Sequence, residues 1–133
     1  MRRFLMVSGV MFAGLVVIYT GGLALFGYAL MRPDPYPVFM SDYLPKGSPS
    51  YQEAALTFSE FVVRTFPIGS DAKDAISQIT KGGFEVKTSS SDSVELLWKR
   101  QAGPCNERYS IVVNHTADAT IAKITGLLHT DCL

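Results

Sequence analysis

Residues 4–31 form an uncharged run of 28 positions without Asp, Glu, Lys, Arg or His, and all twelve acidic residues of the chain follow it. A helix of this length reaches about 42 Å, against a hydrocarbon core of about 30 Å. We therefore expect residues 1–32 to be a transmembrane anchor that contacts the lipid bilayer through residues 4–31. A cleaved signal peptide needs an apolar stretch of only ~7–15 residues, so Gly27-Tyr28-Ala29 is the weaker interpretation as a cleavage site.

The arginines around this run predict its orientation. Arg2 and Arg3 precede it, whereas Arg32 alone follows it. Because cytoplasmic flanks carry the excess of positive charge, we expect a cytoplasmic N-terminus and a periplasmic C-terminal domain. No cysteine precedes Cys105, which excludes a lipid-modified cysteine as the anchor. The predicted address is the bacterial inner (plasma) membrane, with a single pass.

Residues 33–49 hold five of the seven prolines. Proline removes backbone donors and disfavours helix at the preceding residue. We expect a Pro-rich, semi-rigid linker over residues 33–49. Its side chains Tyr36, Val38, Phe39 and Tyr43 would then be free to contact lipid or a neighbour.

Residues 50–133 are predicted to form one domain, and it begins with a helix. Ser50 and Glu53 have the spacing of a capping box, and Pro67 ends the segment. Apolar residues between them recur at i, i+3, i+4 and i+7, which makes one apolar face. These residues are Tyr51, Ala54, Ala55, Phe58, Phe61, Val62 and Phe66.

A second, shorter helix is expected to start at Ser70 and to end at Gly82-Gly83, since glycine tolerates the left-handed conformation after a helix. Its predicted apolar positions are Ala72, Ala75, Ile76 and Ile79. Because about four residues separate the two helices, we expect them to pack as a hairpin.

After Gly83 the period of the pattern changes from 3.6 to 2, which is typical of strands. Phe84 and Val86 alternate with charged residues, and a serine-rich turn follows. Further strands are predicted around residues 94–99, 108–115 and 120–128. The order ααββββ predicts an α+β, two-layer domain with two helices packed on a small antiparallel sheet. Trp98 is expected on the helix-covered side, with a partner interface as the alternative.

Cys105 and Cys132 are the only cysteines. If the last hairpin turns on Asp118 and Ala119, paired residue numbers sum to 237. Cys105 then lies opposite Cys132 on an apolar face, where cross-strand side chains are ~4.5–5.5 Å apart. Together with an oxidising compartment, this register predicts a disulfide between Cys105 and Cys132.

A metal or redox site is the alternative use of Cys132. His129, Asp131 and Cys132 are close in sequence, but their spacing matches no zinc pattern. The same register separates His129 from His115, the only other histidine. There is no C-x-x-C pair, so a thioredoxin-like centre is not indicated. We predict no metal ligands.

No motif in the chain indicates catalysis. The nucleophile elbow, the phosphate loop and the dinucleotide fingerprint are all missing from the sequence. Twelve basic and twelve acidic residues balance, and beyond residue 40 they are interspersed, so a nucleic-acid partner is not expected. We therefore predict no enzymatic activity, no catalytic residues and no cofactors.

One stretch resembles a known family. Phe66-Pro67-Ile68-Gly69-Ser70, the short helix to Ile79, Gly82-Gly83-Phe84 and the following strands look like the SmpA/OmlA (BamE-like) envelope domains, over about residues 66–128. The resemblance implies two helices on a small antiparallel sheet and a role in holding protein partners in the bacterial envelope. This chain carries a hydrophobic run where those proteins carry a lipidated cysteine.

The predicted function follows from the anchor, the cysteine pair and the lack of reactive groups. We expect a membrane-anchored, extracytoplasmic protein-interaction module, an accessory or assembly subunit of a bacterial cell envelope with partners in the membrane or periplasm. The alternative is a ligand-sensing or binding domain with a pocket between the helices and the sheet.

Overall fold

The chain divides into two compact units, Met1–Arg32 and Pro33–Leu133. The computed structural model describes residues 19–28, 33–44 and 50–132. Residues 19–28 are helical. Within the described ranges, no helix is both long and apolar enough to cross a membrane. The predicted anchor over residues 1–32 lies mostly outside the described residues, so it stays a prediction.

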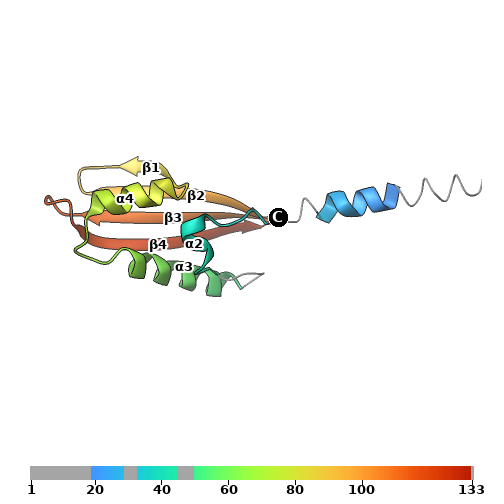
Figure 1. The fold of residues 1–133 in the computed structure, drawn as a ribbon, viewed down its shortest axis with the longest axis horizontal. Helices are drawn as coiled ribbons and strands as arrows, with labels where there is room; N and C mark the ends of the chain where they lie inside the picture. Colours follow the sequence, from blue (N-terminus) through green and yellow to red (C-terminus); the bar gives the residue numbers. More distant parts are fainter. Residues whose placement is uncertain (1–18, 29–32, 45–49, 133) are drawn as a thin grey trace, which may run out of the picture. The chain divides into compact units, whose positions relative to one another are not determined.

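The second unit is an α+β fold in which all helices lie on one face of a four-stranded antiparallel sheet of order β1-β2-β3-β4 (Figure 1). The elements are α2 (Val38–Ser41), α3 (Tyr51–Thr65), α4 (Ala72–Lys81), β1 (Glu85–Ser89), β2 (Ser93–Ala102), β3 (Cys105–His115) and β4 (Ile121–Cys132). The predicted α+β class with an antiparallel sheet is thus confirmed, while the transmembrane helix predicted before it stays a prediction. The predicted helix pair corresponds to α3 and α4, and α2 is additional.

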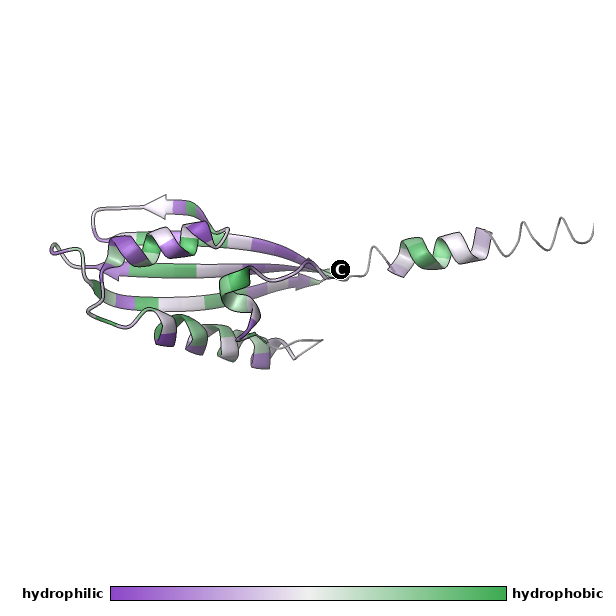
Figure 2. Cartoon of the chain, viewed as in Figure 1, coloured by the Kyte–Doolittle hydropathy of each residue, from purple (hydrophilic) through white to green (hydrophobic). Residues whose placement is uncertain are grey.

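The helix α3 begins as its sequence predicts. The Ser50 side chain accepts a hydrogen bond from the Glu53 amide at 3.2 Å. The helix buries its apolar side over β4, and its polar side faces outward (Figure 2). At Gly126 of β4 this contact is so close that an added Cβ would lie 2.8 Å from Val62 Cγ2. A glycine is therefore needed beneath α3.

The helix α4 starts later than predicted. Its N-cap is Asp71, whose carboxylate accepts from the Asp74 amide at 2.9 Å. Ser70 instead donates its hydroxyl to the Pro67 carbonyl at 2.7 Å, inside the preceding turn. At the other end Gly83 has φ +96°, the left-handed conformation that the Gly82-Gly83 pair predicted.

The expected hairpin of α3 and α4 is wrong. Each helix packs on the sheet separately, α3 against β4 and α4 against β2 and β3. The reason is Phe39. Its ring centroid lies 5.7 Å from the ring centroid of Phe61 in α3 and 6.0 Å from that of Phe84, which follows α4. An aromatic side chain from upstream in the chain thus lies between the two helices.

Phe39 belongs to residues 33–44, which we call the strap. These residues differ from the predicted linker because they pack on the domain. The Asp34 amide donates to the Gln101 carbonyl at 2.8 Å, and the Gln101 amide donates to Asp34 Oδ2 at 3.0 Å. Met40 and Leu44 are buried in the core. Residues 33–37 of the strap, with three prolines, form no helix and α2 follows them; the apolar side chains of the strap bury against the core because water solvates them poorly. The rest of the linker, residues 45–49, lies outside the described residues.

Gly82 makes room for the strap. A Cβ added at Gly82 would overlap the Phe39 ring. We expect Gly82→Ala to lower the free energy of unfolding by about 1–3 kcal/mol, the usual cost of overpacking. Urea unfolding of the full chain, followed by Trp98 fluorescence, measures this.

The control for this prediction is the same substitution in a Phe39→Ala background. In that background the ring that would overlap the added Cβ is gone, so Gly82→Ala should hardly change the free energy of unfolding. A double-mutant cycle should therefore show coupling between the two substitutions. Equal losses in both backgrounds would mean that Gly82 is needed for another reason.

The strand register of the last hairpin is confirmed. Ile111 pairs with Gly126 and Cys105 with Cys132, with an irregularity only near Asn114 and His115. Ala119 in the turn has φ +58°. The side chains facing the helices form a single core, which includes Phe58, Phe61, Phe84, Leu96, Tyr109, Ile111 and Val113.

Candidate interaction face

Within the second unit, no described element covers the sheet face opposite the helices (Figure 1). Strand alternation places on it the residues that are out of phase with the core. We call this surface the open face, and its members are all partly or fully exposed. In β2, β3 and β4 they are Ser93, Glu95, Leu97, Lys99, Gln101, Asn106, Arg108, Ser110, Val112, Asn114, Lys123, Thr125, Leu127, His129 and Asp131.

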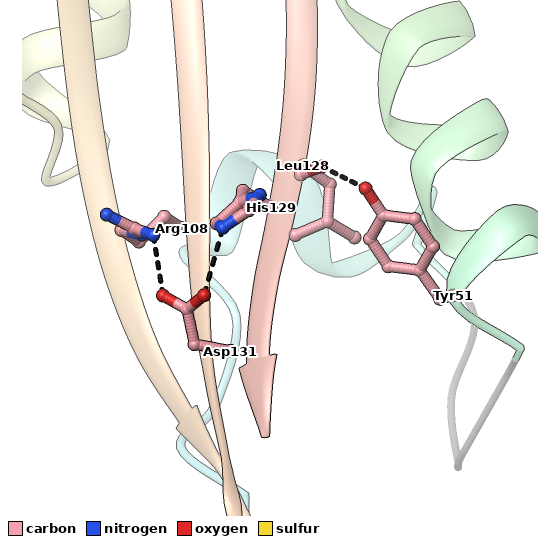
Figure 3. A network of polar contacts seen from close by, with 5 residues as sticks. All are labelled: Tyr51, Arg108, Leu128, His129 and Asp131. Atoms are coloured by element: carbon pink, nitrogen blue, oxygen red, sulfur yellow. Dashed lines mark hydrogen bonds and ion pairs between the residues drawn. The ribbon is translucent and has the colours of Figure 1, made fainter. Parts of the chain in front are cut away.

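A row of basic side chains crosses the open face. Lys99 pairs with Arg108, and Arg108 pairs with His129 on the next strand. Like charges directly opposite one another destabilise a sheet. Asp131 offsets part of this cost, since Arg108 Nη2 lies 2.5 Å from Oδ2 and His129 Nε2 lies 2.9 Å from Oδ1 (Figure 3). Lys99 forms no ion pair with any residue that the structure describes.

An apolar row lies beside the basic one. Leu97 pairs with Ser110, and Ser110 pairs with Leu127, whose side chain is 55% exposed. The two rows are two residues apart along each strand, which is about 7 Å. A shallow depression of about 530 Å³ covers both rows. Its lining residues are Lys87, Leu97, Lys99, Arg108, Ser110, Leu127 and His129, without a carboxylate.

Both edges of the sheet are protected against strand addition. β1 is short and carries a register irregularity between Val86 and Thr88, which disrupts pairing. At the other edge the Tyr51 hydroxyl donates to the Leu128 carbonyl at 2.7 Å, so α3 occupies an outward-facing acceptor of β4 (Figure 3). A partner therefore has better access to the open face than to an edge.

Cys105 and Cys132 are joined by a disulfide at the end of β3 and β4. Their Cα atoms are 4.1 Å apart, close to the short spacing of a non-hydrogen-bonded antiparallel pair. By alternation the pair lies on the helix-covered side, in phase with Tyr109. The disulfide thus fastens the ends of two strands without occupying the open face.

The two histidines are not brought together. His129 contacts Asp131 on the open face, whereas His115 lies at the far end of β3, where Nδ1 is 3.2 Å from the Thr116 carbonyl. Among residues 19–28, 33–44 and 50–132, no group of three His, Cys, Asp or Glu side chains is arranged to hold a metal ion. The geometry gives the alternative metal site near Cys132 no support.

Sequence reasoning missed a buried polar cluster beneath the strap. Arg100 Nε lies 3.3 Å from Glu107 Oε2 but has no hydrogen-bond partner within the described part of the chain. Glu107 Oε2 instead accepts from the Tyr109 hydroxyl at 2.8 Å, and the Tyr109 and Tyr36 hydroxyls are 3.3 Å apart. Burial, followed by the hydrogen bonds with Tyr36 and Glu107, raises the pKa of Tyr109.

This cluster attaches the strap to the sheet. The Arg100 guanidinium lies over the Tyr36 ring, with Cζ 3.9 Å from its centroid. A sequence signal for the cluster exists, because Arg100 continues the alternating phase of Leu96 and Trp98. Trp98 itself lies on the helix-covered side, as predicted, with its ring centroid 5.3 Å from that of Tyr109. The Arg100 and Glu107 side chains are 6% and 16% exposed, and both residues line a shallow depression of about 410 Å³ that Asp34 of the strap also lines.

Comparison with known proteins finds no family model, no curated protein and no solved structure that matches this chain. The resemblance of residues 66–128 to SmpA/OmlA (BamE-like) domains therefore stays a prediction.

Proposed function

We propose that this protein is a membrane-anchored, extracytoplasmic protein-interaction module that binds its partner on the open face. The observation that carries the proposal is the unequal covering of the sheet. One face is packed by α2, α3 and α4, while the other carries Leu127 at 55% exposure beside a basic row. Leu97 and Leu127 lie in one row of this face and Val112 in the next, and an apolar patch rimmed by polar residues is typical of a protein contact.

The proposed address rests on the sequence. The uncharged run over residues 4–31 and the arginines before it support a single-pass protein of the bacterial inner membrane with a periplasmic domain. The Cys105–Cys132 pair suits an oxidising compartment. We propose that the module serves as an accessory or assembly subunit of the cell envelope.

The alternative of a ligand pocket between helices and sheet is less favoured. The side chains at that interface are buried and contact one another, with Phe58 and Tyr109 rings 5.0 Å apart. A drug-sized ligand needs a cavity of ~300 Å³ or more. The core residues occupy the space in which the alternative puts this cavity.

Site-specific photo-crosslinking in intact cells tests the proposed function. A photoreactive amino acid at Leu127 of the full chain should give protein adducts that mass spectrometry identifies. The matched control places it at Gln78, an exposed position of α4 on the helix side. Adducts from Gln78 alone, or no adduct from either position, would contradict binding at the open face.

A further inference from the structure

We infer that the open face takes an acidic protein segment in extended conformation, in which carboxylates and apolar side chains alternate on the side that faces the sheet. This inference rests on the proposed function and names the chemistry of the partner. It follows from the charges, the spacing of the two rows and the limits of the depression.

The charge of the depression favours an anionic occupant. Its lining includes Lys87, Lys99, Arg108 and His129 but no acidic residue. Lys87 Nζ is paired with Glu95 at 3.0 Å. Carboxylates on neighbouring positions are already engaged: Asp131 contacts Arg108 and His129, and Asp34 accepts from the Gln101 amide. Lys99 is thus the cation with the most to gain from a carboxylate of the partner.

The spacing of the rows favours an extended segment. The basic and apolar rows are two residues apart along the strands, about 7 Å. In an extended chain lying along the strands, side chains i and i+2 are also about 7 Å apart and point to the same side. One side chain of the segment would therefore meet Lys99 and Arg108, while the next on that side meets Leu97, two residues from Lys99 on β2.

The layout of the face favours a narrow protein segment over an anionic membrane surface. A bilayer is broad and would meet the acidic Glu95 and Asp131 on the same face as well as the cations. A single extended segment contacts the depression and avoids the flanking carboxylates. Like charges brought face to face reduce affinity, so the narrow occupant gains more from the basic row.

The test uses the full chain in nanodiscs of phosphatidylcholine and a fluorescent peptide of repeated Asp-Ser-Leu-Ser, in which Asp and Leu alternate on one side of the extended chain, with an Asn-for-Asp peptide as its counterpart. Fluorescence anisotropy should show binding of the Asp peptide that weakens when salt is raised about tenfold, because exposed charges are screened. Lys99→Glu should lower the affinity about threefold to tenfold. Lys73→Glu, the same charge change on exposed α4, should have no effect.

Equal binding of the two peptides would overturn the inference, and so would equal effects of Lys99→Glu and Lys73→Glu on peptide affinity. A third contrary result is that neither peptide binds while the chain binds phosphatidylglycerol vesicles in a Lys99-dependent way. The last would assign the row to lipid. Failure of the inferred acidic segment can be distinguished from failure of the proposed function. If Leu127 adducts persist in the Lys99→Glu chain, the interaction module stands while the acidic segment does not.

Discussion

Replacing Glu107 with Gln is expected to lower the free energy of unfolding by about 3 kcal/mol, because it leaves the Arg100 guanidinium buried without a counter-charge. The side chain of Arg100 is 6% exposed and that of Glu107 is 16% exposed, so water replaces the lost partner poorly. The substitution also weakens the acceptor of the Tyr109 hydroxyl. Urea unfolding of the full chain, followed by Trp98 fluorescence, measures the loss.

Glu95→Gln is the matched control for this substitution. Glu95 pairs with Lys87, but their side chains are 28% and 55% exposed. An exposed ion pair of this kind contributes about 0–1 kcal/mol. A second variant removes both buried charges, Arg100→Met with Glu107→Leu, and should recover much of the stability. Similar losses for Glu107→Gln and Glu95→Gln would show that Arg100 is better hydrated than its burial indicates.

The buried cluster matters because it joins the strap to the sheet. Tyr36 contacts Arg100 and Tyr109, while Asp34 is paired with Gln101 through two backbone-directed hydrogen bonds. The first residues of the strap are thus held to the sheet by packed contacts and hydrogen bonds.

Local signals in the sequence predicted much of this fold. The Ser50 cap, the end of α3 before Pro67 and the glycine termination of α4 each depend on neighbouring residues alone. The β3–β4 pairs from Asn114 to Cys105 agree with the register expected from a turn at Asp118 and Ala119, and the pairing shifts by one residue between Asn114 and His115. Elements determined by a few consecutive residues were thus accessible without a structure.

The strap was not accessible, since it depends on contacts between distant residues. Its prolines predicted an extended spacer, whereas Val38–Ser41 form α2, and nothing local shows that Phe39 reaches Gly82 or that Asp34 reaches Gln101. Contacts between distant residues also explain why the predicted hairpin of α3 and α4 is wrong. The pairing of α3 with α4 assumed that nothing lay between them, whereas Phe39 does.

Only part of the open face could be predicted from the sequence. Alternation correctly separated the two faces of β2, so Lys99 was out of phase with the apolar Trp98. The basic row appears only when β2 is registered against β3 through the turn at Gly103 and Pro104. Sequence reasoning had fixed the β3–β4 pairing alone, and so it could place Arg108 beside His129 but not Lys99 beside Arg108.

Loss of the disulfide is the second large effect that we expect. Cys105 and Cys132 are 27 residues apart, and a closed loop of this length stabilises a fold by about 3.5 kcal/mol in the chain-entropy model. The double variant Cys105→Ser with Cys132→Ser should therefore unfold at markedly lower urea. The slope of the transition should also change, since the unfolded chain becomes more expanded.

A reductant separates the cross-link from the side chains. Dithiothreitol should lower the stability of the natural chain to about that of the double variant and leave the double variant unchanged, because only the covalent link is removed. Alkylating thiols at the moment of lysis extends the test to the cell. A protein with its domain in the periplasm should show no free thiol, as disulfides persist in oxidising compartments. Two free thiols in the cell, together with full stability in dithiothreitol, would refute both the stabilising role of the disulfide and the proposed periplasmic location of the domain.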